Sequence, residues 1–497
     1  MKPYILAIDA GTTSSRAIVF DGNTKKIGLG QFQFTQHFPQ PSLVEHDANE
    51  IWSTQHKAIK EALKQAKVKP NQISAIGITN QRETTVIWDA KTGAPIHNAI
   101  VWQDRRTSDY CASIKATHGE YITAKTGLIT DAYFSGSKIR WILENIAGAR
   151  EKALKGELRF GTIDTWIIWK LTGGRSHITD ASNASRTLLY NIHTGGWDEE
   201  LCALLDVPMS VLPTVVDSSG LLAITDKEIM GEALPISGIA GDQQSALFGQ
   251  LCFEPGEAKN TYGTGCFAVT NTGETIVESS NQMLSTVAWQ LDGKLTYALE
   301  GSVYIAGALV QWLRDGLKII EQNSDIEQLA LREGHSGGIT MVPALTGLGA
   351  PHWDTYARGA LMGITRGTND SHIAYAAIEA ITLSTADVLE AMAKDLGKEL
   401  KVIKVDGGAS ANDTMMQLQA NILGCPVIRP AETESTALGA ALLAGLGIGH
   451  WKDLEELKSL LNVDRSFEPA HLDQKLLRSQ WNRAVEACKG WIQTGTD

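Results

Sequence analysis

The stretch YILAIDAGTTSSRAIVF, residues Tyr4–Phe20, decides the fold of this chain. Its apolar beginning and its apolar end predict two buried strands. Between them lies DAGTTSSR, residues Asp9–Arg16, a polar segment that predicts a tight turn and therefore a β-hairpin. Small residues and hydroxyls at a hairpin tip let backbone N–H groups approach an anion, and Asp9 is suited to hold a divalent cation beside it. Taken alone, the segment also fits an ordinary hairpin.

Two later segments repeat the pattern. They are NTYGTGCF, residues Asn260–Phe267, and VIKVDGGAS, residues Val402–Ser410. No phosphate-binding G-x-x-x-x-G-K-[ST] loop occurs, and no G-x-G-x-x-G follows a predicted strand. The three turns, in this order, resemble the two phosphate-binding turns and the adenosine turn of the superfamily that contains actin, Hsp70-type chaperones and sugar kinases. The resemblance implies an α/β fold with two ribonuclease H-like (actin/Hsp70-type ATPase) domains flanking an interdomain cleft.

The length of 497 residues favours two domains over a single core. A natural break occurs at the segment EPGE, residues Glu254–Glu257. We therefore expect an N-terminal domain over 1–250 with the first hairpin and the acceptor site. A C-terminal domain over 251–497 would carry the second hairpin and the adenosine site, with a helical tail from about 453.

Composition restricts the classes of partner. The net charge of −12 argues against nucleic acid or an anionic membrane as the main partner. No apolar stretch reaches about 18 residues, so membrane insertion is not expected. Six cysteines without any C-x-x-C spacing fit a reducing cytoplasm without a zinc site. The predicted first strand follows Met1–Pro3 directly and leaves no room for a signal peptide, so we expect a cytoplasmic protein.

Apolar periodicity predicts the elements around these turns. The expected helices are Glu50–Ala66, Ser245–Gln250, His372–Leu396, Asn412–Ile422 and Thr436–Leu446, and the expected strands include Ile73–Thr79 and Pro235–Gly241.

Three polar clusters follow apolar segments: NQRET at Asn80–Thr84, WQDRR at Trp102–Arg106 and DQQ at Asp242–Gln244. In open α/β sheets, ligands bind at the carboxyl ends of the strands, so the three clusters are expected to line one cleft. Carboxylates accept from hydroxyls and arginine or amide groups donate to them, which suits a small polyol. Aromatic residues such as Tyr133 and Phe267 are suited to pack against its carbon atoms. Each cluster alone also fits a solvated loop.

Longer motifs identify the chain as similar to the FGGY carbohydrate kinase family. YFSGSKIRW at Tyr133–Trp141 resembles one family signature, and GALMGI at Gly359–Ile364, continuing to Glu379, resembles the other. GITNQRET at Gly77–Thr84 and PALTGLGAP at Pro343–Pro351 resemble the members that phosphorylate glycerol. The motifs extend from residue 4 to about 451.

The resemblance implies ATP-dependent phosphorylation of glycerol to sn-glycerol 3-phosphate, with Mg²⁺ as cofactor. By this resemblance, glycerol is held by Arg82, Glu83, Tyr133, Asp242 and Gln243, with Trp102 and Phe267 against its carbon atoms. The implied nucleotide residues are Thr12, Thr13, Ser14, Arg16, Thr264, Gly307, Gln311, Gly408 and Asn412.

The catalytic set implied for this chemistry is Asp242 as general base, Arg82, and Asp9. Asp9 and Asp242 are the expected magnesium ligands. The family also implies a homo-oligomer, either a dimer or a tetramer.

Two other functions remain open from the sequence. An FGGY kinase for another polyol or a ketose would use the same nucleotide turns. An actin- or Hsp70-like assembly ATPase would also explain those turns, but would leave the three polar clusters without a purpose.

Overall fold

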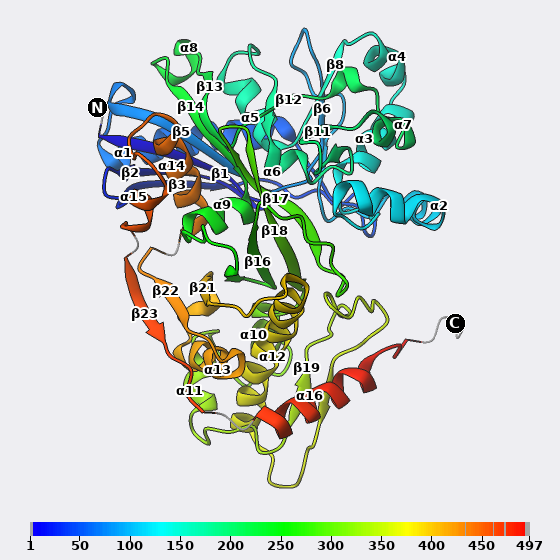
Figure 1. Ribbon diagram of the computed structural model, residues 1–497, viewed down its shortest axis with the longest axis vertical. Helices are drawn as coiled ribbons and strands as arrows, with labels where there is room; N and C mark the ends of the chain where they lie inside the picture. The colour runs from blue at the N-terminus through cyan, green and yellow to red at the C-terminus, as the bar shows by residue number, and fades with distance from the viewer. Residues whose placement is uncertain (1–2, 433, 461, 472–473, 493–497) are drawn as a thin grey trace.

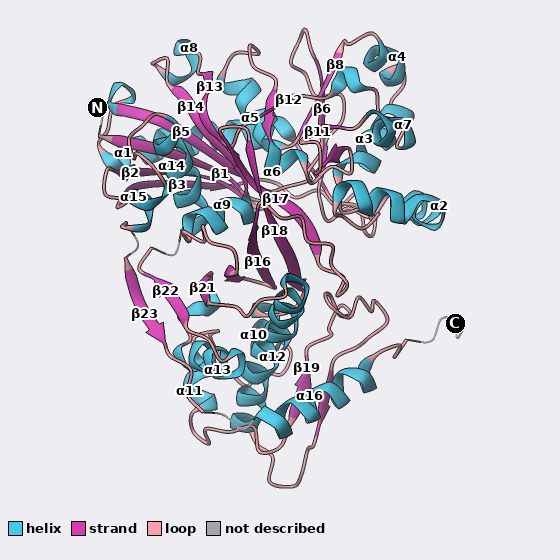
Figure 2. Ribbon diagram, in the orientation of Figure 1, coloured by secondary structure: helices cyan, strands magenta, loops and turns pink. Residues whose placement is uncertain are grey.

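Two mixed β-sheets organise the chain, one built from each half (Figures 1 and 2). The computed structural model describes residues 3–432, 434–460, 462–471 and 474–492. The first sheet has the order β13 (Ser219–Ile224), β14 (Pro235–Gly241), β5 (Ile73–Asn80), β1 (Tyr4–Ala10), β2 (Ser14–Asp21) and β3 (Lys26–Gln33). The second has the order β17 (Leu284–Leu291), β18 (Lys294–Val303), β16 (Cys266–Gly273), β15 (Glu257–Tyr262), β21 (Val402–Asp406), β22 (Val427–Pro430) and β23 (Val463–Phe467).

The two sheets share one topology. β1 pairs antiparallel with β2 and parallel with β5, and β5 pairs parallel with β14. In the second sheet, β15 pairs antiparallel with β16 and parallel with β21, and β21 pairs parallel with β22. This arrangement is the ribonuclease H-like one, so the expected fold of two such domains is confirmed. The predicted first hairpin is confirmed too, with strands at Tyr4–Ala10 and Ser14–Asp21.

Helices cover both sheets. α1 (Ala48–Ala66) packs on β2 and β3, and its first turn is capped by Asp47, whose side chain accepts from the backbone N–H of Asn49. α12 (Asp370–Leu396) and α13 (Asp413–Leu423) belong to the core of the second half. α14 (Ser435–Gly447) packs against β1, β5 and β14. The expected helices and strands therefore exist, with their ends shifted by at most three residues.

Helices α9 (Asp242–Gly249) and α14 cross at two glycines. A Cβ atom on Gly439 would lie 1.8 Å from the carbonyl oxygen of Ser245, and one on Gly249 would lie 2.0 Å from that of Ser435. Any larger side chain would force the helices apart. α14 thus belongs to the second half of the sequence but packs on the first sheet. The packing of the helices therefore does not divide at residue 250. The boundary at that residue stays a prediction.

The segment between β5 and β13 forms a lobe beside the first sheet (upper right in Figure 1). Its helices are α2 (Ser108–Thr126), α3 (Ser135–Asn145), α4 (Ala149–Leu154), α5 (Ile163–Leu171), α6 (Ala181–Ala184) and α7 (Glu199–Leu204). Its short strands are β6 (Val86–Asp89), β7 (Ala99–Ile100), β8 (Leu158–Gly161), β9 (Ile178–Asp180), β10 (Tyr190–Asn191), β11 (Gly196–Trp197) and β12 (Thr214–Val216); β7 pairs with β4 (Glu45–His46). The remaining elements are α8 (Lys227–Met230), α10 (Gly307–Asp315), α11 (Asp325–Ala330), β19 (Thr340–Val342) and β20 (Ala360–Met362).

The tail differs from the expectation of a helical segment from about 453. It contains α15 (Leu454–Lys458) and α16 (Gln474–Cys488), but β23 lies between them and pairs antiparallel with β22 at the edge of the second sheet. Four of the five β23 residues are exposed and only Phe467 is buried. A strand with one buried side chain has no apolar alternation, so the sequence gives no signal for it.

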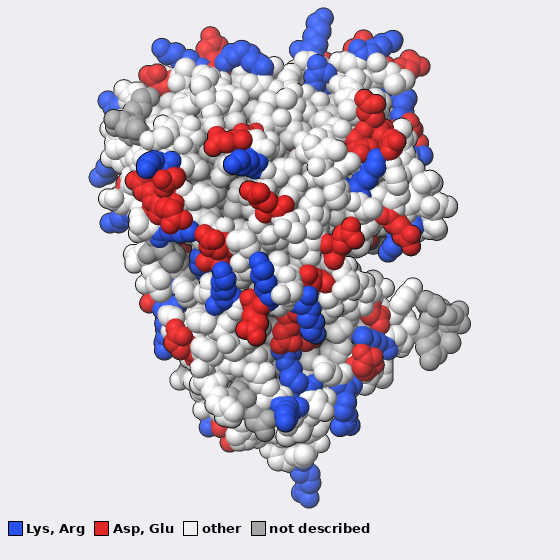
Figure 3. Space-filling view, in the orientation of Figure 1, with Lys and Arg blue, Asp and Glu red and all other residues white. Residues whose placement is uncertain are grey.

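The six cysteines are buried and free. Among the described residues, no helix combines the length and the apolar character needed to cross a bilayer. On the face seen in Figure 3, acidic and basic side chains are interspersed, and no extended basic surface is visible there.

Candidate active site

Three parallel strands bring the candidate catalytic residues to one edge of the first sheet. Asp9 in β1 pairs with Thr79 in β5, and Thr79 pairs in turn with Ala240 in β14. Arg82 follows β5 by two residues, and Asp242 follows β14 directly. All three side chains therefore start at the carboxyl ends of neighbouring strands, where α/β sheets bind their ligands.

A strained turn places Arg82 and Glu83. Glu83 has φ +60°, in the left-handed region, and the backbone N–H of Thr84 donates to the carbonyl of Arg82 at 2.7 Å. A non-glycine residue in this region costs about 1–3 kcal/mol and persists where its surroundings hold it. Here the hydroxyl of Ser135 donates to the carbonyl of Glu83 at 2.9 Å. Both charged side chains are buried.

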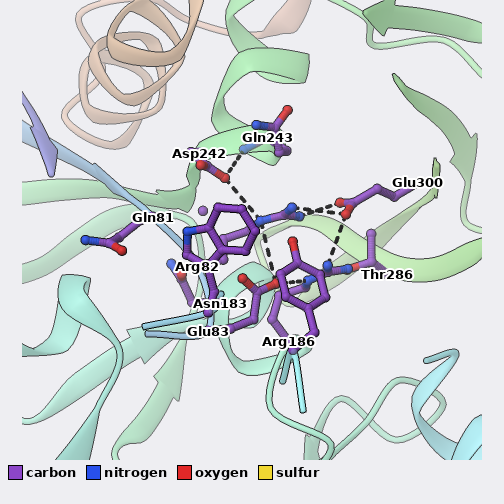
Figure 4. Close-up of polar contacts among 12 residues, drawn as sticks. Gln81, Arg82, Glu83, Asn183, Arg186, Asp242, Gln243, Thr286 and Glu300 are labelled. Atoms are coloured by element: carbon purple, nitrogen blue, oxygen red, sulfur yellow. Dashed lines mark hydrogen bonds and ion pairs between the residues drawn. The ribbon is translucent and has the colours of Figure 1, made fainter. Parts of the chain in front are cut away.

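The guanidinium of Arg82 is held from several sides (Figure 4). Its Nε lies 3.1 Å from Oδ1 of Asp242, and its Nη1 donates to Oε1 of Gln244 at 3.2 Å. Its two terminal nitrogens both donate to Glu300, at 3.0 Å for the Nη2 bond. Burial opposes the charge of Arg82, but Glu300 and Glu83 raise its pKa above the usual value.

Asp242 is poised as a base. It begins α9, and its Oδ1 accepts from the backbone N–H of Gln243 at 2.7 Å. Burial raises the pKa of Asp242 to about 6, and the positive charge of Arg82 opposes that rise. The side chain still exposes 31% of its surface, so it is accessible to solvent. A carboxylate with a pKa near the working pH is suited to general-base catalysis.

Sequence reasoning missed two members of this charged group, Glu300 and Arg186. Arg186 Nε donates to Oε1 of Glu83 at 2.6 Å, and its Nη2 donates to Oε1 of Glu300 at 3.0 Å. Although burial opposes it, the pKa of Glu300 is lowered to about 2 by Arg186 and Arg82. The sequence offered one signal for each residue, a single charged side chain within an otherwise uncharged segment. Glu300 lies in LTYALEG at 295–301, and Arg186 lies in NASRT at 183–187. That signal marks a paired charge but does not identify its partner.

Aromatic side chains lie beside the charges. Trp102 packs edge-on against Tyr133 with ring centroids 5.6 Å apart, and its Nε1 donates to Oγ1 of Thr12 at 3.1 Å. Trp102 therefore links the first hairpin to the acceptor side. Phe267 pairs with Ser302, two residues beyond Glu300 on β18, so Phe267 and Glu300 face the same side of the second sheet. Gln243 is close to the buried ammonium group of Lys259, which donates to its Oε1.

Within the cluster Trp102–Arg106, the prediction of an acceptor-lining role is wrong for Asp104 and Arg106, whose side chains are buried. Asp104 accepts from the backbone N–H of Val44 at 2.7 Å and from Arg106, and Arg105 pairs with Asp131 at 2.6 Å. These charges hold the loops of the lobe together. A sequence pattern alone does not distinguish a ligand-facing carboxylate from one that caps backbone N–H groups.

A cavity of about 490 Å³ lies in the second half, beside the second hairpin. Five of the predicted nucleotide residues line it: Thr264, Gly307, Gln311, Gly408 and Asn412. Apolar side chains form another part of the lining and suit a flat ring. They are those of Val310, Ile326, Ile378, Ile381 and Met415. Gly407 has φ +85°, and a Cβ atom there would lie 2.5 Å from the carbonyl oxygen of Tyr262, so this turn requires glycine.

The other four predicted nucleotide residues lie in the first hairpin and not in this cavity. The hairpin is closed by the N–H of Gly11, which donates to the carbonyl of Ser14 at 3.0 Å. Thr13 is exposed at its tip, whereas the hydroxyl of Ser14 accepts from Gln31 at 3.0 Å. Arg16 pairs with Asp9 and, at 2.7 Å, with Glu434. The guanidinium of Arg16 is thus engaged by carboxylates.

The carboxylates Asp9 and Asp242 fit a magnesium ion by their chemistry. Asp9 pairs with Arg16 through Oδ2, and Asp242 uses Oδ1, so each keeps one oxygen without a hydrogen bond to the described part of the chain. Oxygen ligands are those that Mg²⁺ prefers, and it commonly keeps several waters. Because the two strands lie two positions apart in the sheet, about 10 Å, water would complete a shared site.

A second candidate metal cluster, Glu333, His335 and His372, does not suit a cation. The backbone N–H groups of Gly337 and Asn369 donate to Nδ1 of the two histidines at 3.0 Å and 3.2 Å. A neutral imidazole that accepts at Nδ1 carries its proton on Nε2 and has no lone pair left for a metal.

Comparisons with known proteins give one consistent result. Models of the N-terminal and C-terminal domains of the FGGY family of carbohydrate kinases match residues 4–249 and 258–448. A glycerol kinase of Deinococcus radiodurans is 60% identical over 491 residues, 98% of each chain, and one of Carboxydothermus hydrogenoformans is 57% identical over 494 residues, 99% of each. The crystal structure of Plasmodium falciparum glycerol kinase with ADP matches with a TM-score of 0.93 at 37% identity, covering 99% of this chain and 98% of that one.

Proposed function

Because this chain belongs to the FGGY family of carbohydrate kinases, we propose that it transfers the γ-phosphoryl group of ATP to a terminal hydroxyl of glycerol. The product is sn-glycerol 3-phosphate. The observation that carries the proposal is the convergence of Arg82, Glu83 and the raised-pKa carboxylate of Asp242 at one edge of the first sheet. The glycerol kinases that resemble the chain over nearly its whole length support the choice of acceptor.

Asp242 acts on the acceptor as general base. Its carboxylate takes the proton of the terminal hydroxyl while the hydroxyl oxygen forms a bond to the γ-phosphorus. The bond from that phosphorus to the β–γ bridging oxygen breaks, and its electron pair leaves with ADP. Phosphoryl transfer depends mainly on such positioning and on charge stabilisation.

Glycerol is held by hydrogen-bond donors and by hydrogen-bond acceptors of the protein. Arg82 and Gln243 donate to glycerol oxygens, Glu83 accepts from a hydroxyl, and Tyr133 offers its phenolic O–H. Trp102 and Phe267 pack against the carbon atoms. The ion pairs of Arg82 turn its charge toward Asp242 and Glu300, which favours orienting the acceptor and the base over direct contact with the phosphoryl group.

The nucleotide lies with its base in the cavity lined by Gln311 and Asn412, and with its phosphates toward the Gly-Thr hairpins. Asp9 and Asp242 would hold Mg²⁺, with water between the ion and Asp242, so that one oxygen of Asp242 stays available for the hydroxyl proton. When bound, the ion would supply neutralisation of phosphate charge.

An acceptor panel tests the proposal. ADP release is measured with Mg·ATP and glycerol, erythritol, ribulose, xylulose or no acceptor. Turnover with glycerol far above the other acceptors supports the proposal. Preference for a ketose would assign the chain to another FGGY kinase activity, and hydrolysis independent of any acceptor would favour an assembly ATPase.

The family resemblance also implies a cytoplasmic location and a homo-oligomer, either a dimer or a tetramer, and we include both in the proposal. Sedimentation equilibrium of the purified chain tests the oligomer: a dimer or tetramer supports it, and a monomer at all concentrations contradicts it.

A further inference from the structure

Glu300 is the point at which the two halves of the chain meet within the charged group. It lies on β18 of the second sheet, whereas Arg82, Glu83 and Arg186 belong to the first half (Figure 4). Arg82 and Arg186 both donate to its carboxylate, and the two bonds to Oε1 are each 3.0 Å long. The four side chains are between 0% and 3% exposed. They form a buried, alternating chain of two cations and two anions.

Stability alone does not account for this network. A buried ion pair gains in Coulomb attraction about what its charges lose in hydration, and well-packed apolar residues often serve as well. Removal of one partner is different, because it leaves an unpaired charge in the interior. Arg82 and Glu83 must be charged to bind an acceptor, so each needs a counter-ion that keeps it in place.

The hydrogen bonds assign one counter-ion to each. The carboxylate of Glu300 accepts hydrogen bonds from both terminal nitrogens of Arg82. Two hydrogen bonds to one carboxylate fix the plane of a guanidinium. Nη2 of Arg82 keeps one N–H that makes no bond within the described residues. Arg186 holds Oε1 of Glu83 at 2.6 Å, and Oε2 of Glu83 is likewise left without a bond there. The network thus leaves one donor on Arg82 and one acceptor on Glu83 for hydroxyl groups, whereas Nη1 of Arg186, which also makes no hydrogen bond there, is buried.

We propose that Glu300 and Arg186 are positioning residues of the acceptor site: Glu300 fixes Arg82 across the two halves of the chain, and Arg186 fixes Glu83. Neither contacts the acceptor itself. The inference rests on the proposed function, because it assumes that Arg82 and Glu83 bind glycerol.

The two Michaelis constants separate positioning from a structural role. Glu300 and Arg186 contact the residues that would bind the acceptor, and neither lines the nucleotide cavity. Loss of either contact should therefore weaken the binding of glycerol and leave the binding of ATP unchanged.

The test compares Glu300→Gln and Arg186→Lys with wild type in steady-state kinetics, with glycerol and ATP varied in turn. We expect Glu300→Gln to raise the KM for glycerol about tenfold or more, as for loss of a hydrogen bond to a charged group, and to leave the KM for ATP within about twofold. Arg186→Lys keeps the charge but cannot bridge two carboxylates, so it should raise the KM for glycerol by less.

Asp198→Asn is the matched control. This carboxylate accepts from Lys125 at 3.0 Å in the outer lobe and has a side chain 10% exposed, away from the cleft. A KM for glycerol in Glu300→Gln equal to that of wild type would overturn the inference. The inference would also be overturned if Glu300→Gln raised the KM for glycerol and the KM for ATP equally and lost thermal stability to the same extent as Asp198→Asn. If Glu300→Gln does not fold, Arg186→Lys decides by the same criteria. Failure of wild type to phosphorylate glycerol would instead reject the proposed function.

Discussion

Nε of Arg82 lies 3.1 Å from Oδ1 of Asp242, so a permanently charged guanidinium holds a carboxylate whose pKa burial raises to about 6. The contact joins the ends of β5 and β14, two adjacent parallel strands. It holds Oδ1 of the candidate base, while Oδ2 makes no hydrogen bond within the described residues. The roles of both residues can be separated by substitution.

Asp242→Asn keeps the size of the side chain and removes the base. We expect kcat to fall about 10²–10⁴-fold, the usual contribution of a general base. Nucleotide affinity should persist, because the cavity lies in the other half of the chain. Steady-state kinetics and ADP titration calorimetry check this pair of results. A kcat near that of wild type would remove Asp242 from the role.

The pKa of Asp242, raised by burial to about 6, predicts a pH dependence. Only the ionised form accepts a proton, so kcat/KM for glycerol should be constant at higher pH and fall as pH decreases through about 6. The limb should have a slope of one, since one group titrates. A profile measured at saturating ATP that stays flat to pH 5 would contradict the assignment.

The nucleotide cavity can be filled at Gly408. A Cβ atom there meets no heavy atom within 4 Å, so Gly408→Val is tolerated by the free protein and occupies space in the cavity. We expect a higher KM for ATP and little change in the KM for glycerol. Gly196→Val is the matched control, since Gly196 is equally unobstructed but lies in the outer lobe. Equal kinetics for the two variants would place ATP elsewhere.

The crossing of α9 and α14 predicts a strong stability effect. The Cβ atom of Gly439→Ala would lie 1.8 Å from the carbonyl oxygen of Ser245, so the helices must separate. Overpacking of this kind typically costs about 1–3 kcal/mol in the free energy of unfolding, and the displaced α9 begins with Asp242. The melting temperature in thermal denaturation and kcat should both fall for Gly439→Ala, whereas Gly196→Ala should change neither. An unchanged melting temperature for Gly439→Ala would contradict this packing.

The sequence predicted the parts of the fold that depend on local pattern. β1, β5 and β14 are buried along almost their whole length, and such strands read as continuous apolar runs. β23 was missed because four of its five residues are exposed at the sheet edge.

The site divides in the same way. Arg82 and Asp242 could be found because each ends a recognisable strand. Glu300 and Arg186 could not, because their roles depend on contacts 218 and 103 residues distant in the chain. Asp104 was predicted to line the acceptor site but accepts from the backbone N–H of Val44 instead. The local sequence does not distinguish a carboxylate that binds a backbone N–H group from one that binds a ligand.

The measurement that tests the central claim most directly is a proton-coupled ³¹P NMR time course with Mg·ATP and glycerol. The account predicts loss of the γ-phosphate signal and equal growth of ADP and of one phosphate monoester. That monoester should appear as a triplet, because a phosphate on a terminal carbon couples to two protons. A doublet from the secondary carbon, or inorganic phosphate as the only new monophosphate, would contradict the account.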